Sequence, residues 1–135
     1  MSIRHLNPEG LNLMPEIYSQ AVTAQGGRLV FLAGQGGYDA SGKIARGDYE
    51  AQTRQAFRNL CTALAAAGGG PEHVVMSTMY VKDLHPEALE AFARAMSSAL
   101  DGKAFPPNAS TLVGVQGLAY PEMLVEINAI AVVPA

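Results

Sequence analysis

The chain has 135 residues, of which 49% are hydrophobic and only 16% are charged, and its formal net charge is -3 at pH 7. This length suits one domain with one core, and a chain so poor in charge is expected to hide apolar surface against copies of itself. The 9 basic residues are scattered along the sequence, so no cationic stripe is available to follow a nucleic-acid backbone, and DNA binding is not expected.

Cysteine and histidine are too sparse for a metal site. Cys61 is the only cysteine, which excludes an internal disulfide and a cysteine-based zinc cluster. His5, His73 and His85 lack the spacing of two ligands on one helical turn. The N-terminal MSIRHLNPEG has no apolar signal core, and the longest apolar runs are too short to cross a bilayer. We therefore expect a cytoplasmic protein with no metal, no cofactor and no membrane partner.

Three strands are expected before the first helix, near Ile3 to Leu6, Tyr18 to Ala24 and Leu29 to Gln35. Gly26 and Gly27 separate the second strand from the third. Glycine tolerates the positive φ that tight turns demand, so these two strands are predicted to form a hairpin.

A first helix is predicted between Asp48 and about Ala67. The Asp48 carboxylate can accept hydrogen bonds from the free amide groups of the first turn, which makes it a suitable N-cap. Four residues recur at helical spacing and are expected to share the inner face: Phe57, Leu60, Cys61 and Leu64. Three glycines and Pro71 end the helix.

A second helix is predicted from about Pro86 to Leu100, after a strand from about His73 to Val81. Two more strands follow, near Ala109 to Gln116 and Met123 to Val133. The residues expected on the inner face of the second helix are Leu89, Phe92, Ala93, Met96 and Leu100. Two helices can cover only one face of such a sheet, so the sequence predicts a single α+β domain over residues 1–135.

The last strand has two different faces. One alternating set is wholly apolar and is expected to face the helices: Val125, Ile127, Ala129, Ala131 and Val133. The other set is also largely apolar, but it contains Glu126 and Asn128. This second face fits a surface that packs against neighbouring subunits around something polar.

Six segments, which together extend over nearly the whole chain, resemble the Rid family, also called the YjgF family. They are YSQAV from Tyr18, GQ from Gly34, GDYEAQTRQAFRNL from Gly47, VV from Val74, FPP from Phe105 and LVEINAIAV from Leu124. The resemblance implies a chorismate-mutase-like fold with a mixed sheet, assembled as a homotrimer whose sheets face inward. It also implies a small-molecule cleft at each subunit boundary.

The best-known members of this family hydrolyse reactive imines and enamines, which releases ammonia and a 2-keto acid. The resemblance gives ligand-binding roles to Tyr18 and Gly34, and it makes Glu126 the expected general base or water-positioning group. The family's pocket arginine is absent. Aligning its P-A-R-S/T segment with this chain places Ser110 at the arginine position, followed by Thr111, and both are candidate ligand-binding residues.

Loss of the arginine changes the expected substrate. A guanidinium grips a carboxylate through two charge-assisted hydrogen bonds, whereas a serine hydroxyl offers one neutral donor. We therefore expect little activity on 2-imino acids. Ala33 likewise stands where the family's turn has a serine.

Three functions remain open at this point. The first is a hydrolase that acts on an imine or enamine without the carboxylate clamp. The second is a non-catalytic ligand-binding or chaperone-like trimer. The third, a ribonuclease, ranks lowest because the chain is acidic and has no evident pair of histidine and lysine.

Each candidate residue also has a structural alternative. Glu126 is equally consistent with a carboxylate satisfied by amides at a subunit boundary. Tyr18 would then pack with its hydroxyl at the rim of the domain, and Ser110 and Thr111 would cap a turn.

Overall fold

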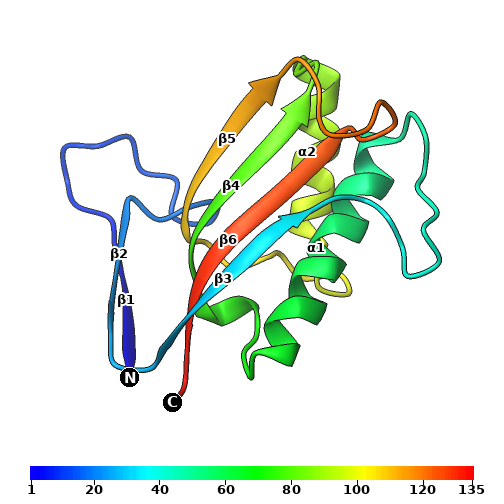
Figure 1. The fold of residues 1–135 in the computed structure, drawn as a ribbon. Coiled ribbons are helices and arrows are strands. Elements are labelled where there is room, and N and C mark those ends of the chain that lie inside the picture. The colour runs from blue at the N-terminus through cyan, green and yellow to red at the C-terminus, as the bar shows by residue number, and fades with distance from the viewer.

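The computed structural model describes all 135 residues as a mixed four-stranded sheet with two helices on one face and a separate pair of strands (Figure 1). In chain order the elements are β1 (Ser2–Leu6), β2 (Ala21–Gln25), β3 (Arg28–Gln35), α1 (Tyr49–Ala66), the 3-10 turn η1 (Pro71–His73), β4 (Val74–Lys82), α2 (Pro86–Ser97), β5 (Ala109–Val115) and β6 (Val125–Val133). Neither α-helix is long and apolar enough to span a bilayer.

The main sheet has the strand order β3-β6-β4-β5. β6 runs antiparallel to both β3 and β4, whereas β4 and β5 are parallel and are joined through α2. Both helices lie behind the sheet in Figure 1 and leave its other face uncovered. The predicted α+β class and the two helices on one face are therefore confirmed.

The predicted hairpin through Gly26 and Gly27 is wrong in its pairing. Both glycines have the expected positive φ, 75° and 74°. However, β2 pairs with β1 in a two-stranded sheet, and β3 pairs with β6. Because every strand edge offers the same backbone groups, turn chemistry specifies the conformation of the two glycines but not which edge β2 joins.

The N-terminus of α1 follows the prediction. The Asp48 side chain accepts a hydrogen bond from the amide of Ala51 at 2.9 Å, and the first helical residue is Tyr49. The helix ends at Ala66, two residues before Gly68, whose φ of 84° lies in the left-handed region.

Replacing Asp48 by alanine is expected to lower the free energy of unfolding by about 1 kcal/mol, because it leaves a first-turn amide without its acceptor. Urea denaturation of the variant measures this loss. Glu90→Ala, at an exposed position on α2, is the matched control and should stay within about 0.5 kcal/mol of the parent. An equal loss in both variants would mean that the cap has no special role.

The core between α1 and the sheet matches the sequence pattern. Phe57, Leu60 and Leu64 are buried, and Cys61 is half-buried beside them. Burial raises the pKa of the Cys61 thiol, so this cysteine is a packing residue and not a reactive thiolate.

The predicted inner face of α2 is partly wrong. Leu89 and Ala93 are exposed, whereas Phe92 and three alanines are buried: Ala88, Ala91 and Ala95. These small side chains let α2 approach α1 closely, and Phe92 meets Phe57 with ring centroids 6.0 Å apart. The prediction placed Leu89 at the contact between the two helices because leucine is more hydrophobic than alanine. The structure has small residues there because the two helices lie close together.

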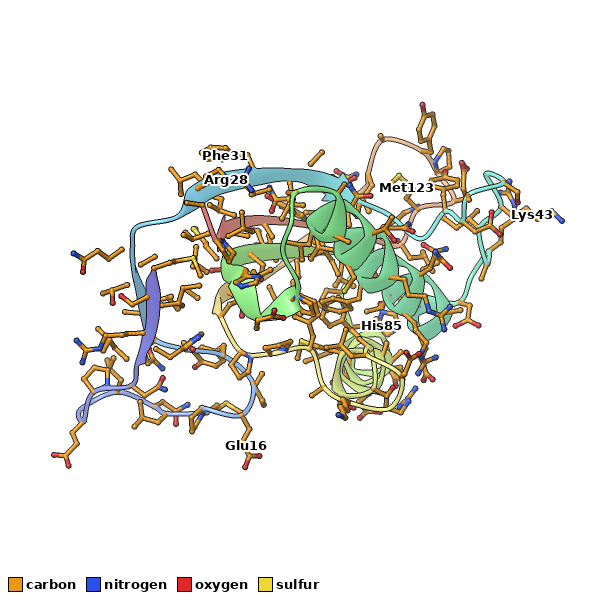
Figure 2. All side chains as sticks on the ribbon, turned by 90° about the horizontal axis from the view of Figure 1, so that it is seen from below. Glu16, Arg28, Phe31, Lys43, His85 and Met123 are labelled. Carbon is orange, nitrogen blue, oxygen red and sulfur yellow. The ribbon has the colours of Figure 1, made fainter.

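The two faces of β6 differ as predicted. Its alternating apolar set is buried under the helices: Val125, Ile127, Ala129, Ala131 and Val133. On the uncovered face, Leu29, Phe31 and Met76 are 65%, 73% and 48% exposed. Figure 2 shows Phe31 projecting from β3 away from the helices. This uncovered apolar face of the sheet is referred to below as the open face.

Candidate functional site

Glu126 lies near the start of β6 on the open face, opposite Tyr80 of β4. It is half-buried, and its carboxylate takes part in none of the side-chain hydrogen bonds or ion pairs formed within the chain. The amide of Asn128, two residues along the strand, donates no hydrogen bond to it. The carboxylate is therefore free to bind a water molecule or a ligand.

Gly34 lies directly against Glu126. A Cβ atom at Gly34 would be 2.7 Å from the Cδ atom of Glu126, closer than real contacts allow. The register of β3 on β6 also shifts between Leu32 and Gln35, which places Gly34 in a bulge. The structure therefore brings Gly34 and Glu126 together, as the resemblance implied, and glycine is required for the carboxylate to lie across β3.

Ser110 points away from this carboxylate. Ser110 pairs with Ser77 across β4 and β5, and Ser77 pairs in turn with Ala129. Residues directly opposite in a sheet share a face, and Ala129 is buried on the helix side. Ser110 therefore belongs to the helix side of the sheet and not to the face that carries Glu126.

Thr111 lies on the open face by the same reasoning. It pairs with Thr78, and Thr78 pairs with Asn128 of β6. Within one chain, the whole of β4 separates Thr111 from Glu126. The register makes Thr111, one residue after the aligned Ser110, the polar side chain of the aligned segment Asn108 to Thr111 that shares a face with Glu126.

Tyr18 lies in the irregular segment before β2, directly after the turn over residues 15–17, and not within a strand. Its hydroxyl donates to the carbonyl of Asn12 at 3.4 Å. The next residue, Ser19, donates its amide to the carbonyl of Asn108 at 2.9 Å, which ties this segment to the start of β5. The candidates thus form two groups in one chain, with Glu126 and Gly34 in one and Tyr18 beside the start of β5 in the other.

An open cavity of about 930 Å³ adjoins Gly34 and Glu126 at the end of β3. It is also lined by residues of α1 and of two loops, among them Tyr38, Arg58, Asn59, Tyr120 and Met123. Met123 is labelled in Figure 2, beside the helices at this end of the molecule. Sequence reasoning did not predict these lining residues. The helical spacing of Arg58 indicates an outward position, but nothing in the sequence shows that this side of α1 borders the end of β3.

Two tyrosines form one wall of the cavity. The Tyr38 hydroxyl donates to the Oε1 atom of Glu122 at 2.9 Å, and its ring meets that of Tyr120 edge-on at 6.4 Å. Burial, followed by the hydrogen bond to Glu122, raises the pKa of Tyr38. Tyr38 is therefore a protonated structural contact at neutral pH and not a base.

No three histidine, cysteine, aspartate or glutamate side chains lie close enough together to hold a metal ion. The chemistry that this arrangement can perform is that of a free carboxylate beside an open cavity. Such a group can take a proton from water or from a bound ligand.

Comparison with known proteins shows similarity over nearly the whole chain. Residues 14–133 match the family described as Endoribonuclease L-PSP. Protein DfrA of Myxococcus xanthus is 39% identical over 119 residues, which are 85% of this chain and 84% of that protein.

Solved structures show the same similarity. The Rid-family protein YyfB of Yersinia pestis superposes with a TM-score of 0.87 at 36% identity, covering 98% of this chain and 100% of that one. Rv2704 of Mycobacterium tuberculosis, a member of the YjgF/YER057c/UK114 family, gives a TM-score of 0.63 at 34% identity, with 86% of each chain covered.

Proposed function

Because the chain belongs to the Endoribonuclease L-PSP family, which includes the Rid and YjgF proteins, we propose that it is a homotrimer that hydrolyses a small imine or enamine between its subunits. The observation that carries the proposal is the unpartnered Glu126 carboxylate, which rests on Gly34 at the edge of an apolar sheet face. An acidic chain with this lone carboxylate is better suited to proton transfer with a small molecule than to RNA cleavage.

Glu126 acts as the general base in the proposed hydrolysis. Its carboxylate accepts a proton from a water molecule as the water oxygen bonds to the carbon of the C=N group. Glu126 passes this proton to the nitrogen, which gives a carbinolamine. The hydroxyl proton of the carbinolamine then moves to the nitrogen as the C–N bond breaks, so that ammonia leaves and a carbonyl product remains. An enamine first takes a proton at carbon and then follows the same course. The cleft also raises the rate of hydrolysis by holding the water molecule and the substrate next to each other.

The trimer accounts for the two separated groups of candidate residues. Tyr18 and Thr111 lie towards the start of β5, and Glu126 lies beside β3, at the other edge of the sheet. We infer that Tyr18 and Thr111 of one subunit face Glu126 of the next, so that each cleft is built from two chains. The exposed Leu29 and Phe31 supply the apolar surface that such packing buries.

The substrate follows from the polarity of this cleft. Thr111 offers a neutral hydroxyl on the open face, and Ser110 points elsewhere, so β5 provides no cation for a carboxylate attached directly to the C=N carbon. We therefore propose that 2-imino acids bind poorly and that the reacting end of the substrate is uncharged.

Ammonia release tests this function directly. An amine oxidase acting on a primary amine generates an imine without a carboxylate, and an amino-acid oxidase generates 2-iminopropanoate. The protein should accelerate ammonia release from the first imine much more than from the second. No acceleration with either imine would favour the non-catalytic ligand-binding alternative, and turnover of 2-iminopropanoate at the rate of arginine-containing relatives would refute the substrate assignment.

Phe31→Glu is expected to convert the trimer into smaller species, because it places a charge in the apolar contact between subunits. Sedimentation velocity at several protein concentrations measures the change. Leu89→Glu on the outer side of α2 is the matched control, since Leu89 is also exposed, at 46%, but lies away from the open face. A monomeric parent protein, or an unchanged assembly in Phe31→Glu, would contradict the proposed trimer.

A further inference from the structure

Arg58 is the only cationic side chain among the residues that line the cavity beside Glu126. It is exposed on α1, and it forms no ion pair or side-chain hydrogen bond within the chain. Two other arginines of the helices are engaged within the chain. Arg54, one turn earlier, donates to the Ser98 hydroxyl at 3.0 Å, and Arg94 donates to Glu50 at 2.8 Å. The guanidinium of Arg58 is therefore available to an anion in the cavity.

Apart from the Tyr120 hydroxyl, the other polar side chains of the cavity form hydrogen bonds within the chain. Gln55 donates to the side chain of Asn59 at 2.9 Å, and Asn59 donates to the carbonyls of Gly36 and Tyr38 at 2.9 and 2.7 Å. These bonds hold the loop after β3 against α1. Asn59 thus forms part of the cavity wall, and both of its amide protons are already used within the chain.

Asp39, the second acid of the cavity, is turned into its own loop. Its carboxylate accepts from the hydroxyl and the amide of Ser41 at 2.7 and 2.9 Å, and from the amide of Lys43 at 3.0 Å. The Oδ1 atom of Asp39 is therefore occupied by the turn. Arg58 and Glu126 are the charged side chains of the cavity that form no hydrogen bond or ion pair within the chain.

These two groups reach the cavity from opposite sides of the sheet. Glu126 rises from the open face of β6, whereas Arg58 belongs to α1, which covers the other face (Figure 1). They line the same space at the end of β3, where Gly34 and Gly36 have no side chains and Glu126 and Met123 lie directly against the backbone. The edge of the sheet therefore lies between the anionic group of a ligand bound at Arg58 and the reacting group of the same ligand at Glu126.

We propose that Arg58 binds the carboxylate of the substrate, and that this carboxylate lies several bonds away from the C=N carbon. The single guanidinium matches the single charge of a carboxylate better than the double charge of a phosphate, and its two parallel donors match the geometry of a carboxylate. This inference rests on the proposed hydrolysis at Glu126. It specifies the substrate class as imines or enamines of longer oxo acids, in contrast to 2-imino acids.

Binding of product-like oxo acids to the whole protein tests the assignment. NMR titration with pyruvate, 4-oxopentanoate and 6-oxoheptanoate varies the separation between carbonyl and carboxylate, and the methyl ester of 6-oxoheptanoate removes the charge. Affinity should rise with the separation, and the acid should bind about tenfold more tightly than its ester, as expected for one charge-assisted contact.

Arg58→Gln should weaken binding of 6-oxoheptanoate about tenfold and leave binding of the ester unchanged. Lys103→Gln, which removes an equal charge from a residue outside the cavity, should alter neither. Equal affinity for acid and ester, an unaffected Arg58→Gln variant, or tighter binding of inorganic phosphate than of any oxo acid would each overturn the proposal. Arg58-dependent binding without ammonia release from any imine would refute the proposed hydrolysis and leave the carboxylate site standing.

Discussion

Replacing Gln52 by leucine is expected to lower the free energy of unfolding by roughly 3–5 kcal/mol, the largest effect on stability that we anticipate from one side chain. Gln52 is fully buried on α1. Its Nε2 atom donates to the carbonyls of Ala45 and Glu122 at 2.9 and 3.0 Å, and its Oε1 atom accepts from the amide of Leu124 at 2.8 Å. Leucine fills a similar volume but leaves the carbonyl of Glu122 and the amide of Leu124 without partners, and it removes one of the two hydrogen bonds to the carbonyl of Ala45.

The same bonds join three segments that surround the cavity. They fix the loop before α1 and the segment before β6 to the helix itself, so the loss should also loosen the cavity wall. Urea denaturation at one fixed protein concentration measures the stability change, because the stability of an oligomer depends on concentration. Gln55→Leu is the matched control. Gln55 donates only to the side chain of Asn59, so its replacement should cost about 1 kcal/mol or less. Equal losses in the two variants would show that the buried network is not what stabilises this region.

The sequence was sufficient for the local conformation of most elements. Asp48 predicts the start of α1 because its carboxylate accepts a hydrogen bond from a free amide of the first helical turn. The alternation of residues along β6 predicts which side chains face the helices. Long-range pairing was less predictable. Gly26 and Gly27 adopt the predicted positive φ, yet β2 joins β1, because pairing depends on the backbone edges that meet after the chain folds.

The residues of the candidate site were likewise predictable only in part from the sequence. Glu126 was predictable as an acid on an apolar face, and its contact with Gly34 agrees with the family resemblance. The distinction between Ser110 and Thr111 required the register of β5 on β4, since a shift of one residue reverses the face of every side chain. Arg58 was not predictable as a cavity residue, because α1 and the end of β3 are brought together only by tertiary packing.

Replacing Glu126 by glutamine is expected to reduce the rate of ammonia release about 10²–10⁴-fold, the range associated with loss of a general base. Glutamine keeps the length of the side chain and its packing on Gly34, so the cavity and the trimer should be preserved. The binding of 6-oxoheptanoate should therefore change little, because Arg58 is retained. A large fall in rate with nearly constant binding separates a role in proton transfer from a purely structural role.

Glu122→Gln provides the matched control for Glu126→Gln. Glu122 is also a carboxylate near the cavity, but its Oε1 atom accepts the hydrogen bond of Tyr38, and the amide oxygen of glutamine can accept the same bond. This variant should retain most of the activity. If Glu126→Gln kept full activity, or if both variants lost activity equally, proton transfer could not be assigned to the free carboxylate on β6. Selective loss in Glu126→Gln would instead assign that step to the one acid that the chain leaves unpaired beside Gly34.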